Sequence, residues 1–229
     1  ELMAHSQLSE KWFNKFKDLS EHQATDGQMI ALGAIRQCYS YKTTEEVLNT
    51  EYDKYFGEKG KDGKRLFTQI VKSGHTSTLE GIHFTFAVEG VSRALLAQLT
   101  RHRQLSFSVQ SQRYNKFSSD SRSGGFDYVI PHTMDDADKK YAFKQMMIQA
   151  QGNYNLLIKM GVPQEDARAV LPNSATCNLV TSGNLRAWLE FYKKRKPGEG
   201  GQFEITQFAE HIKNEIISVE PWTKEYFEL

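Results

Sequence analysis

The sequence predicts a single α+β domain, and three observations support this class. Residues 82–88 alternate apolar and polar side chains with a period of two, which is typical of a half-buried strand. Several longer stretches repeat apolar residues every three to four positions, which is typical of amphipathic helices. The 229 residues contain neither an internal repeat nor a clear linker, and this length suits one domain with a sizeable core.

The first third of the chain is predicted to be largely helical. Residues 51–64 are the exception, because they crowd charges and three glycines, which indicates a surface excursion. The predicted helices here are a helical N-terminal extension within residues 1–25, with an apolar stripe at Leu8, Trp12, Phe16 and Leu19, a helix over 28–39, a helix that follows the capping-box pair Thr43 and Glu46, and a short helix over 66–71 that ends at Gly74.

The rest of the chain combines short strands with helices. Residues 115–125 are rich in serine, glycine and charge, which predicts a loop. The predicted elements are, in order, the strand over 82–88, a helix over 91–99, an extended run to Arg113, a short strand over 128–130, a long helix from about Asp135 to Gly161, a helix with Pro163 at its first position, a strand over 176–181, a helix capped by Asn184, and a last helix over 205–219 that Pro221 stops.

Composition narrows the class of protein further. The formal net charge of +1 argues against a nucleic-acid-binding domain, because such domains tend to be clearly basic. Cys38 and Cys177 are too few for a disulfide framework or a zinc pattern, which fits a reducing cytoplasm. No stretch approaches the roughly 18 apolar residues of a membrane span, and no secretory signal is visible. We therefore expect a cytoplasmic protein whose anion sites are local.

Residues 98–114 form the most informative stretch. Arg101, His102 and Arg103 follow the predicted helix, and if that helix continues, Gln98 shares an edge with the first two of them. The run that follows contains no acid, and if it is extended, Ser111 and Arg113 point the same way. Planar guanidinium groups beside amide and hydroxyl donors predict a site for an anion, most simply a phosphate.

Further candidates lie elsewhere along the chain. Arg168 stands among apolar residues of a predicted helix, and Arg195 continues the apolar stripe of another; a snorkelling or rim position is the simpler explanation for each. His75, Ser77 and Glu80 lie in a short loop, where each alone is more often a satisfied surface residue. The sequence offers no metal cluster, no catalytic carboxylate pair and no nucleophile elbow, so a cofactor is expected to carry the difficult chemistry.

The order of Arg101-His102-Arg103, seven residues, Ser111 and then Arg113 resembles the defining motif of flavin-dependent thymidylate synthases. The resemblance extends from about residue 38 to Ile205 through ordered landmarks, which are Cys38-Tyr39-Ser40, Gly74-His75 with Ser77 and Glu80, Phe84-Thr85-Phe86, the central motif, Ala167-Arg168-Ala169-Val170-Leu171-Pro172, Asn184 with Arg186, Arg195, and Glu204-Ile205.

This resemblance implies an activity and an assembly. Such enzymes methylate dUMP to dTMP, with 5,10-methylenetetrahydrofolate as carbon donor, NADPH as reductant and FAD as relay. It also implies an antiparallel-leaning mixed sheet packed against long helices, and a homotetramer whose active sites are shared between subunits. The expected partners are dUMP, the folate and further copies of the chain, with no membrane, nucleic acid or metal.

The resemblance also implies roles for single residues. Arg195 matches the arginine that polarises the uracil, and Ser111 the residue that orients the nucleotide; these are the two catalytic assignments. The implied FAD contacts are Ser40, His75, Ser77, Glu80, Arg101, His102, Arg103, Asn184, Arg186 and Glu190. The implied dUMP contacts are Gln98, Arg101, Ser111, Gln112, Arg113, Arg168 and Arg195.

The chain also departs from the family's pattern. Val109-Gln110 stands where many members have Glu or Gln followed by Leu, and the glycine-rich segment 198–201 is longer. Two alternatives remain at this point. One is a single-stranded nucleic-acid-binding module that uses the central cations with Phe107 and Tyr114. The other is a non-catalytic relative that binds flavin or nucleotide.

Overall fold

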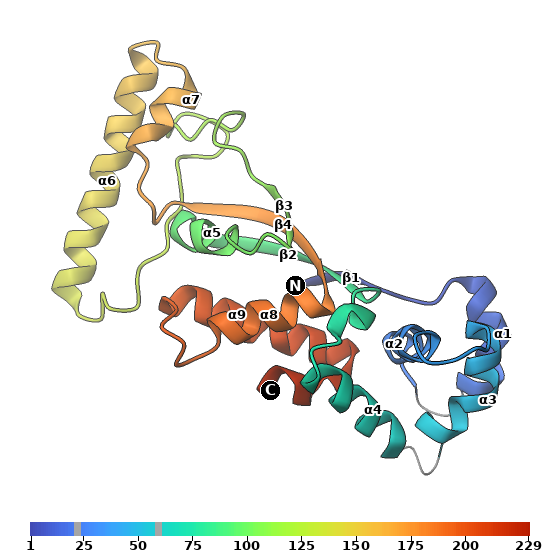
Figure 1. The fold of residues 1–229 in the computed structure, drawn as a ribbon. Coiled ribbons are helices and arrows are strands. Elements are labelled where there is room, and N and C mark those ends of the chain that lie inside the picture. The colour runs from blue at the N-terminus through green and yellow to red at the C-terminus, as the bar shows by residue number, and fades with distance from the viewer. Residues whose placement is uncertain (21–23, 58–60) are drawn as a thin grey trace. The chain divides into compact units, whose positions relative to one another are not determined.

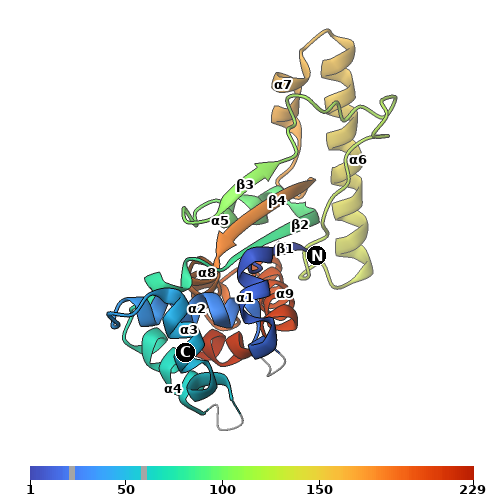
Figure 2. The same ribbon diagram turned by 90° about the vertical axis from the view of Figure 1, so that its right-hand side faces the viewer.

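The fold is built on an antiparallel sheet, seen in a computed structural model that describes residues 1–20, 24–57 and 61–229 (Figure 1). Among these residues the sheet has four strands in the order β1-β2-β4-β3 (Figure 2). They are β1 (Leu2–His5), β2 (His83–Ser92), β3 (Ser106–Val109) and β4 (Thr176–Asn184). The α+β class and the antiparallel leaning of the expected sheet are therefore confirmed, and the sheet is antiparallel rather than mixed.

The two long strands follow their sequence patterns. In β2, Phe84 and Phe86 are fully buried and His83 is exposed, so the period of two that predicted this strand marks its buried face. In β4, Cys177 and Leu179 are buried, whereas Asn178 and Val180 are exposed. Both strands extend beyond the predicted ranges, since each continues directly into the cap of a helix.

The chain groups into two compact units. The first comprises Glu1–Phe86, Ser182–Gly201 and Thr206–Leu229, and the second comprises Ala87–Thr181 and Gln202–Ile205. The chain thus passes from one unit to the other inside β2 and β4, and again just before α9 and within its first turn. Because the boundaries in β2 and β4 lie inside regular elements, no segment with the composition of a linker marks these two boundaries in the sequence.

The first unit is mainly helical. The Thr43–Glu46 capping box is confirmed, because the amide of Thr43 donates to Oε2 of Glu46 at 2.8 Å and the amide of Glu46 donates back to Oγ1 of Thr43 at 3.3 Å. The elements are α1 (Glu10–Ser20), α2 (Asp26–Gln37), α3 (Thr44–Phe56), α4 (Lys61–Lys72), the 3-10 helix η1 (Thr76–Leu79), α8 (Leu185–Arg195), most of α9 (Phe203–Val219), and the 3-10 helix η3 (Pro221–Glu228).

Aromatic side chains fill much of this unit's core. The rings of Phe86 and Trp188 lie edge to face with centroids 5.1 Å apart, and Trp188 meets Phe191 in the same way at 5.8 Å. Phe191 in turn contacts Phe208 of α9 at 5.9 Å. The apolar stripe predicted for α8 is thereby confirmed, since it packs on both the sheet and the last long helix.

The second unit contains the longest described helix. Its elements besides strands are α5 (Arg93–Leu99), α6 (Ala137–Lys159), α7 (Gln164–Ala167) and the 3-10 helix η2 (Arg168–Val170). Asp136 caps α6 by accepting the amide of Lys139 at 2.7 Å, and Gly161 ends the turn after it at a φ of 84°. Tyr154 is fully buried in a small cluster with Phe117.

Several local predictions are wrong for identifiable reasons. The N-terminal extension is helical over α1, as predicted, but it begins with the strand β1, whose residues Leu2 and His5 pair with Phe86 and Phe84. Residues 128–130 form no strand; Tyr128 makes a single antiparallel bridge to Ala175. An edge strand such as β1 depends on its partner more than on its own sequence, so local patterns miss it.

Helix boundaries account for the remaining differences. The helix predicted over 91–99 begins at Arg93, because Val91 still belongs to β2 and Ser92 caps α5 by accepting the amide of Leu95 at 3.0 Å. The surface excursion predicted over 51–64 is mostly α3 and the start of α4, and residues 58–60 lie outside the described part. Among the described residues, no helix combines the length and apolar character that crossing a membrane requires.

Candidate functional site

In the first unit, several predicted flavin contacts meet around Arg186. Its Nη1 donates to Oε1 of Glu80 at 2.7 Å, and its Nε donates to Oε1 of Glu190 at 3.0 Å. These two carboxylates raise the pKa of Arg186, with Glu190 the stronger influence. All three side chains are close to half exposed, so the cluster adds little to stability but holds a planar guanidinium in one orientation facing solvent.

Asn184 fixes the start of α8, which carries this arginine. Its Oδ1 accepts the amide of Ala187 at 2.9 Å, so it is the N-cap, as its sequence position predicted. The amide of Leu185 donates to the carbonyl of Ile82 at 2.7 Å, which ties the start of α8 to the residue that precedes β2. Asn184 therefore has a structural role whether or not it also contacts a ligand.

His75 and Ser40 lie on loops of the same unit. Nδ1 of His75 and the hydroxyl of Tyr39 are 3.0 Å apart, and their rings meet edge to face at 5.9 Å. Oγ of Ser40 accepts the amide of Lys42 at 3.1 Å. Ser77 is exposed on η1, and its carbonyl accepts the amide of Glu80 at 3.1 Å. Tyr39 was not among the predicted contacts, although it belongs to one of the landmark segments.

Arg195 is the last residue of α8 and is half-buried. Its place at the helix C-terminus suits a cation, because the helix dipole is negative at that end. One turn earlier, the hydroxyl of Tyr192 donates to Glu210 at 2.5 Å and accepts Nζ of Lys213 at 2.8 Å. Burial is the main cause that raises the pKa of Tyr192. The buried face of α8 is therefore fully partnered up to the position of Arg195.

In the second unit, the Arg101–Arg103 triplet occupies a turn. Helix α5 ends at Leu99, and the amide of His102 donates to the Leu99 carbonyl at 3.0 Å. The helix therefore does not continue through Arg101 and His102, and the edge that they would share with Gln98 on a helix does not form. Arg101 and Arg103 are exposed on this turn and His102 is half-buried, so both guanidinium groups face solvent.

The Ser111–Arg113 segment is also a turn rather than an extended run. The strand β3 ends at Val109, and the amide of Arg113 donates to Oγ of Ser111 at 3.1 Å. A serine hydroxyl that bonds the backbone two residues on favours such turns. The extended run that would make Ser111 and Arg113 point the same way therefore does not form. Gln112, between them, is half-buried.

Two arginines that are far apart in sequence meet at Glu165 of α7. Nε of Arg113 donates to Oε2 of Glu165 at 3.0 Å, and Nε of Arg168 donates to the Glu165 carbonyl at 2.9 Å. Gln164 also donates to the carbonyl of Arg113. The prediction that Arg113 and Arg168 belong to one site thus has a geometric basis. Glu165 was not predicted as a site residue.

Two glutamines connect the segment before α9 with α5. Nε2 of Gln98 donates to Oε1 of Gln202 at 2.7 Å. Nearby, Glu204 accepts the amide of Ser92 at 2.8 Å and its hydroxyl at 2.5 Å. Arg93 donates to the carbonyl of Gln110 at 2.7 Å, directly before Ser111. Gln202 and Arg93 were not predicted as site residues, because nothing in their local sequence indicates these partners.

The cysteines and acids of the described chain form no further catalytic group. Burial raises the pKa of the Cys177 thiol, which disfavours the reactive thiolate, and Cys38 is exposed at the end of α2. Within the described ranges, no three His, Cys, Asp or Glu side chains lie in positions that could hold a metal ion. The groups of the site that can bind a ligand are therefore mainly cationic and amide side chains.

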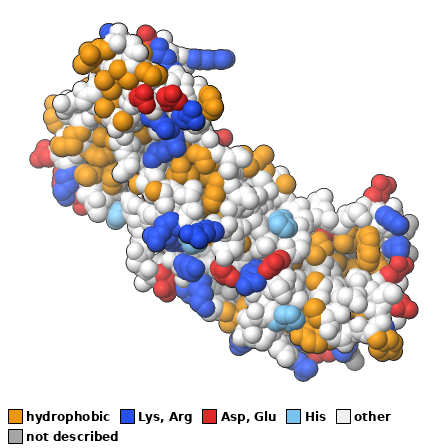
Figure 3. Space-filling view, turned by 45° about the horizontal axis from the view of Figure 1, so that its top comes forward, with side chains coloured by type: hydrophobic (Ala, Val, Ile, Leu, Met, Phe, Trp, Pro, Cys, Tyr) orange, Lys and Arg blue, Asp and Glu red, His pale blue; other side chains and the backbone are white. Residues whose placement is uncertain are grey.

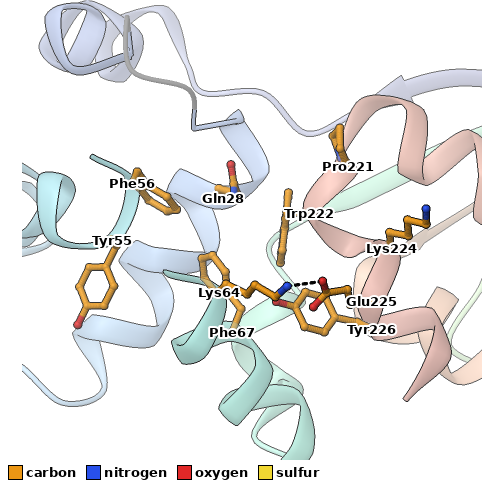
Figure 4. Close-up of a pocket in the computed structure, with 10 residues that line it drawn as sticks. All are labelled: Gln28, Tyr55, Phe56, Lys64, Phe67, Pro221, Trp222, Lys224, Glu225 and Tyr226. Atoms are coloured by element: carbon orange, nitrogen blue, oxygen red, sulfur yellow. Dashed lines mark hydrogen bonds and ion pairs between the residues drawn. The ribbon is translucent and has the colours of Figure 1, made fainter. Parts of the chain in front are cut away.

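Two of the cavities in the first unit have aromatic residues in their walls. One, of about 330 Å³, is lined by Arg186 and Glu190 and so adjoins the predicted flavin contacts. The other, of about 250 Å³, has aromatic walls that include Phe67 and Trp222, whose ring centroids are 4.9 Å apart (Figure 4). The second cavity contains none of the predicted site residues.

The predicted residues therefore divide between the two units. The first unit holds Ser40, His75, Ser77, Glu80, Asn184, Arg186, Glu190 and Arg195. The second unit holds Gln98, Arg101, His102, Arg103, Ser111, Gln112, Arg113 and Arg168.

Comparison with known proteins identifies the family. Residues 19–222 match the family model described as thymidylate synthase complementing protein. The chain belongs to this family. The matched range contains every residue of both sets, so the resemblance that the central motif carries is confirmed for the whole site-bearing part of the chain.

Individual relatives agree with this assignment. A protein named flavin-dependent thymidylate synthase from Geobacter sulfurreducens is 34% identical over 204 residues, which cover 89% of this chain and 82% of the relative. Proteins of the same name from Nitratidesulfovibrio vulgaris and Haloarcula marismortui are 39% identical over 179 residues and 34% identical over 184 residues. These matches cover 72% and 71% of this chain, and 68% and 74% of the relatives, respectively.

Proposed function

We propose that this protein is a flavin-dependent thymidylate synthase that converts dUMP to dTMP, with FAD as cofactor, 5,10-methylenetetrahydrofolate as carbon donor and NADPH as reductant. The observation that carries the proposal is family membership over residues 19–222, which include the Arg101-His102-Arg103 turn and the Ser111–Arg113 turn. FAD, when bound, supplies the hydride chemistry for which the chain itself has no side chain.

The residues of each unit suit the charges of these ligands. The exposed guanidinium groups of Arg101 and Arg103 are appropriate donors for a pyrophosphate, and Arg186 presents a third in a fixed orientation. In the other set, Arg113 and Arg168 are proposed to hold the dUMP phosphate. Without a bound phosphate, Glu165 forms an ion pair with Arg113. The phosphate of dUMP is proposed to displace Glu165 from this pair.

Arg195 is proposed to polarise the uracil. Ser111 is proposed to orient the nucleotide. A guanidinium keeps its charge at any physiological pH, so Arg195 beside the pyrimidine would stabilise negative charge as it develops on the ring. Ser111 has no neighbouring base in the described structure, and its Oγ already accepts the Arg113 amide. A positioning role therefore suits it better than nucleophilic attack.

We further propose a homotetramer with shared active sites. Large apolar side chains are exposed along α6, including Tyr141 at 66%, Ile148 at 63% and Leu156 at 57%. Figure 3 shows hydrophobic side chains gathered over the lobe that holds α6 and α7. Contiguous apolar surface of this kind is typical of protein–protein interfaces. The division of the predicted site residues between two units also suits a site to which different protomers contribute.

The proposed activity is tested with purified protein. We expect a yellow protein, or one that takes up FAD, whose flavin spectrum changes on addition of dUMP. With deuterated NADPH, methylenetetrahydrofolate and dUMP, label should appear in dTMP. A preparation that neither binds FAD nor releases dTMP would overturn the proposal, whereas FAD binding without turnover would favour the non-catalytic relative.

Shared active sites are tested by complementation. Arg186→Ala removes a residue of one set and Arg113→Ala a residue of the other, and each variant alone should be nearly inactive. Co-expressed with two different tags and purified through both, the hybrids should regain a measurable part of wild-type activity. Hybrids that stay as inactive as doubly tagged Arg186→Ala alone would show that every site is built within one protomer.

A further inference from the structure

The cavity of about 330 Å³ beside α8 carries an excess of positive charge. Its cations come from three places in the sequence: Lys72 is the last residue of α4, Arg186 lies in the first turn of α8, and Lys193 and Lys196 lie at the other end of α8. The one acidic side chain among its described lining residues is Glu190. Four cations against one carboxylate leave a net side-chain charge of +3.

This excess belongs to the three lysines. Arg186 is paired with Glu80 and Glu190, as described above. Within the described residues, the ammonium groups of Lys72, Lys193 and Lys196 form no ion pair. Some other lysines of the unit are paired, as Lys64 is with Glu225 at 2.5 Å (Figure 4).

Helix dipoles explain part of this arrangement but not all of it. Lys72 and Lys193 each lie in the last turn of a helix, where positive charge is favoured. The dipoles do not explain why two such ends and Lys196 border one cavity, since like charges that share a cavity repel each other. A bound anion would remove this repulsion, so the convergence points to a polyanionic ligand.

The remaining lining residues of the cavity indicate which other chemical groups the ligand has. Leu189 lines the cavity from α8, and Tyr226 and Phe227 of η3 line it with aromatic rings. Aromatic and aliphatic walls suit a planar base, whereas ammonium groups suit a compact phosphate. The volume lies at the small end of the range for ligand pockets, about 300–1,000 Å³, so it accommodates one nucleoside better than a whole dinucleotide.

We propose that this cavity binds the 2′-phosphorylated adenosine end of NADPH and thereby makes the enzyme prefer NADPH to NADH. The inference rests on the proposed function and deepens it, since it assigns the reductant's distinguishing phosphate to Lys72, Lys193 and Lys196. Cationic side chains are the usual means of accepting a 2′-phosphate in NADP-dependent enzymes. No covalent step occurs in this cavity; it acts through binding alone.

Anaerobic flavin reduction by NADPH and by NADH tests the assignment. Lys72→Ala, Lys193→Ala and Lys196→Ala should each raise the KM for NADPH several-fold, and the Lys72→Ala/Lys193→Ala double variant about tenfold or more. The KM for NADH and the FAD content should stay unchanged. Lys11→Ala, which removes an exposed lysine of the same unit outside the cavity, should behave as wild type.

Other outcomes would overturn the inference. Variants that raise the KM for NADPH and the KM for NADH equally would show that the lysines do not bind the 2′-phosphate. Variants that lose FAD would assign the cavity to the flavin instead. A wild-type protein without preference for NADPH would leave no selectivity to explain, which also contradicts the proposal.

A binding measurement separates this inference from the proposed function. Adenosine 2′,5′-bisphosphate titrated calorimetrically should bind wild type, and adenosine 5′-monophosphate should bind at least about tenfold more weakly. The double variant should lose the difference. This result does not depend on catalysis, so a protein that fails to make dTMP but shows the difference refutes only the enzymatic proposal. Equal binding of the two nucleotides would refute the cavity's assignment alone.

Discussion

Single guanidinium groups carry most of the proposed chemistry, and the structure places each in a different electrostatic setting. Arg186 is paired with two carboxylates, Arg113 with one, and Arg195 stands at a helix C-terminus. A paired guanidinium binds a ligand only by displacing or sharing its partner. The consequences of substitution therefore differ from one arginine to the next.

Arg195→Ala should remove transition-state stabilisation while FAD binding persists. A single donor aimed at developing charge typically contributes about 2.7–4 kcal/mol, so kcat should fall about 100-fold or more. Flavin absorbance of the purified variant and steady-state kinetics measure both effects. A variant with wild-type kcat, or one that loses its FAD, would contradict the assignment to the uracil.

Arg168→Ala and Glu165→Gln should change dUMP affinity in opposite directions. Loss of Arg168 removes a phosphate donor, so the Kd for dUMP should rise about tenfold. Glu165→Gln removes the carboxylate that competes for Arg113; because this pair is about half exposed, the Kd should fall only about two- to fivefold. Titration of dUMP followed by flavin absorbance measures both, and unchanged affinities would place these residues outside the nucleotide site.

Glu220 offers a residue-scale prediction about pH. Its carboxyl is 1% exposed and accepts the amide of Gly27 at 3.1 Å and Nε1 of Trp222 at 2.5 Å. Burial is the main cause that raises the pKa of Glu220, so the folded state prefers the protonated form. Ionisation of this carboxyl therefore lowers the unfolding free energy. The loss is absent below the pKa of the carboxyl in the unfolded state and complete above its raised pKa in the folded state.

Glu220→Gln should remove this pH dependence. The unfolding free energy of wild type, measured with urea at several pH values from about 4 to 8, should fall relative to that of the variant as pH rises through the raised pKa of Glu220. Glu215→Gln, which changes a less buried carboxylate of α9, provides the comparison. Parallel curves for wild type and Glu220→Gln would show that the buried carboxyl is not the cause.

At the scale of elements, the site depends on how helices begin and end. Helix α8 starts at the Asn184 cap and carries Arg186, Glu190 and Arg195, so one element presents candidates at both its ends. The helix α5 ends just before the Arg101–Arg103 turn. Caps and turns thus set the direction in which functional side chains leave the scaffold.

Substitutions of Asn184 separate its capping role from a flavin contact. Asn184→Ala should lower the unfolding free energy by about 1 kcal/mol through loss of the cap, whereas Asn184→Ser should retain most of it. If Asn184 also contacts FAD, both variants should bind FAD more weakly at a temperature where both are folded. Unchanged FAD affinity in the two variants would leave Asn184 with the capping role only.

At the scale of the whole molecule, the two compact units and the exposed face of α6 point to assembly. Tyr141, Ile148 and Leu156 recur at intervals of seven and eight residues, so they lie on one side of this helix. Each remains exposed in the single chain. A stripe of this length is costly in water unless another molecule covers it.

Charge placed on this stripe should dissociate the proposed tetramer. Ile148→Lys together with Leu156→Lys should lower the mass measured by light scattering from that of a tetramer toward that of smaller species, and activity should fall with it. Lys11→Glu, a charge change at an exposed residue outside this helix, should leave the mass unchanged. Circular dichroism should be unaffected, because these side chains are exposed within the protomer; a double variant of unchanged mass would exclude this face from the interface.

The sequence by itself determined the local features and the family. The period of two over residues 82–88, the Thr43–Glu46 box and the Asn184 cap act through neighbouring residues, so they can be read from a short window. The central motif was sufficient to indicate the family, because its long and unusual spacing is rarely matched by chance.

The tertiary structure alone decided which distant groups meet. The bond between Gln98 and Gln202, and the meeting of Arg113 with Glu165, join residues 104 and 52 positions apart. Such contacts depend on how elements pack, and no local pattern encodes that packing. A related reason explains the turns at Arg101–Arg103 and Ser111–Arg113, where the sequence had suggested a continued helix and an extended run. In each turn, the backbone finds a hydrogen-bond partner nearby, so the helix or strand ends before it.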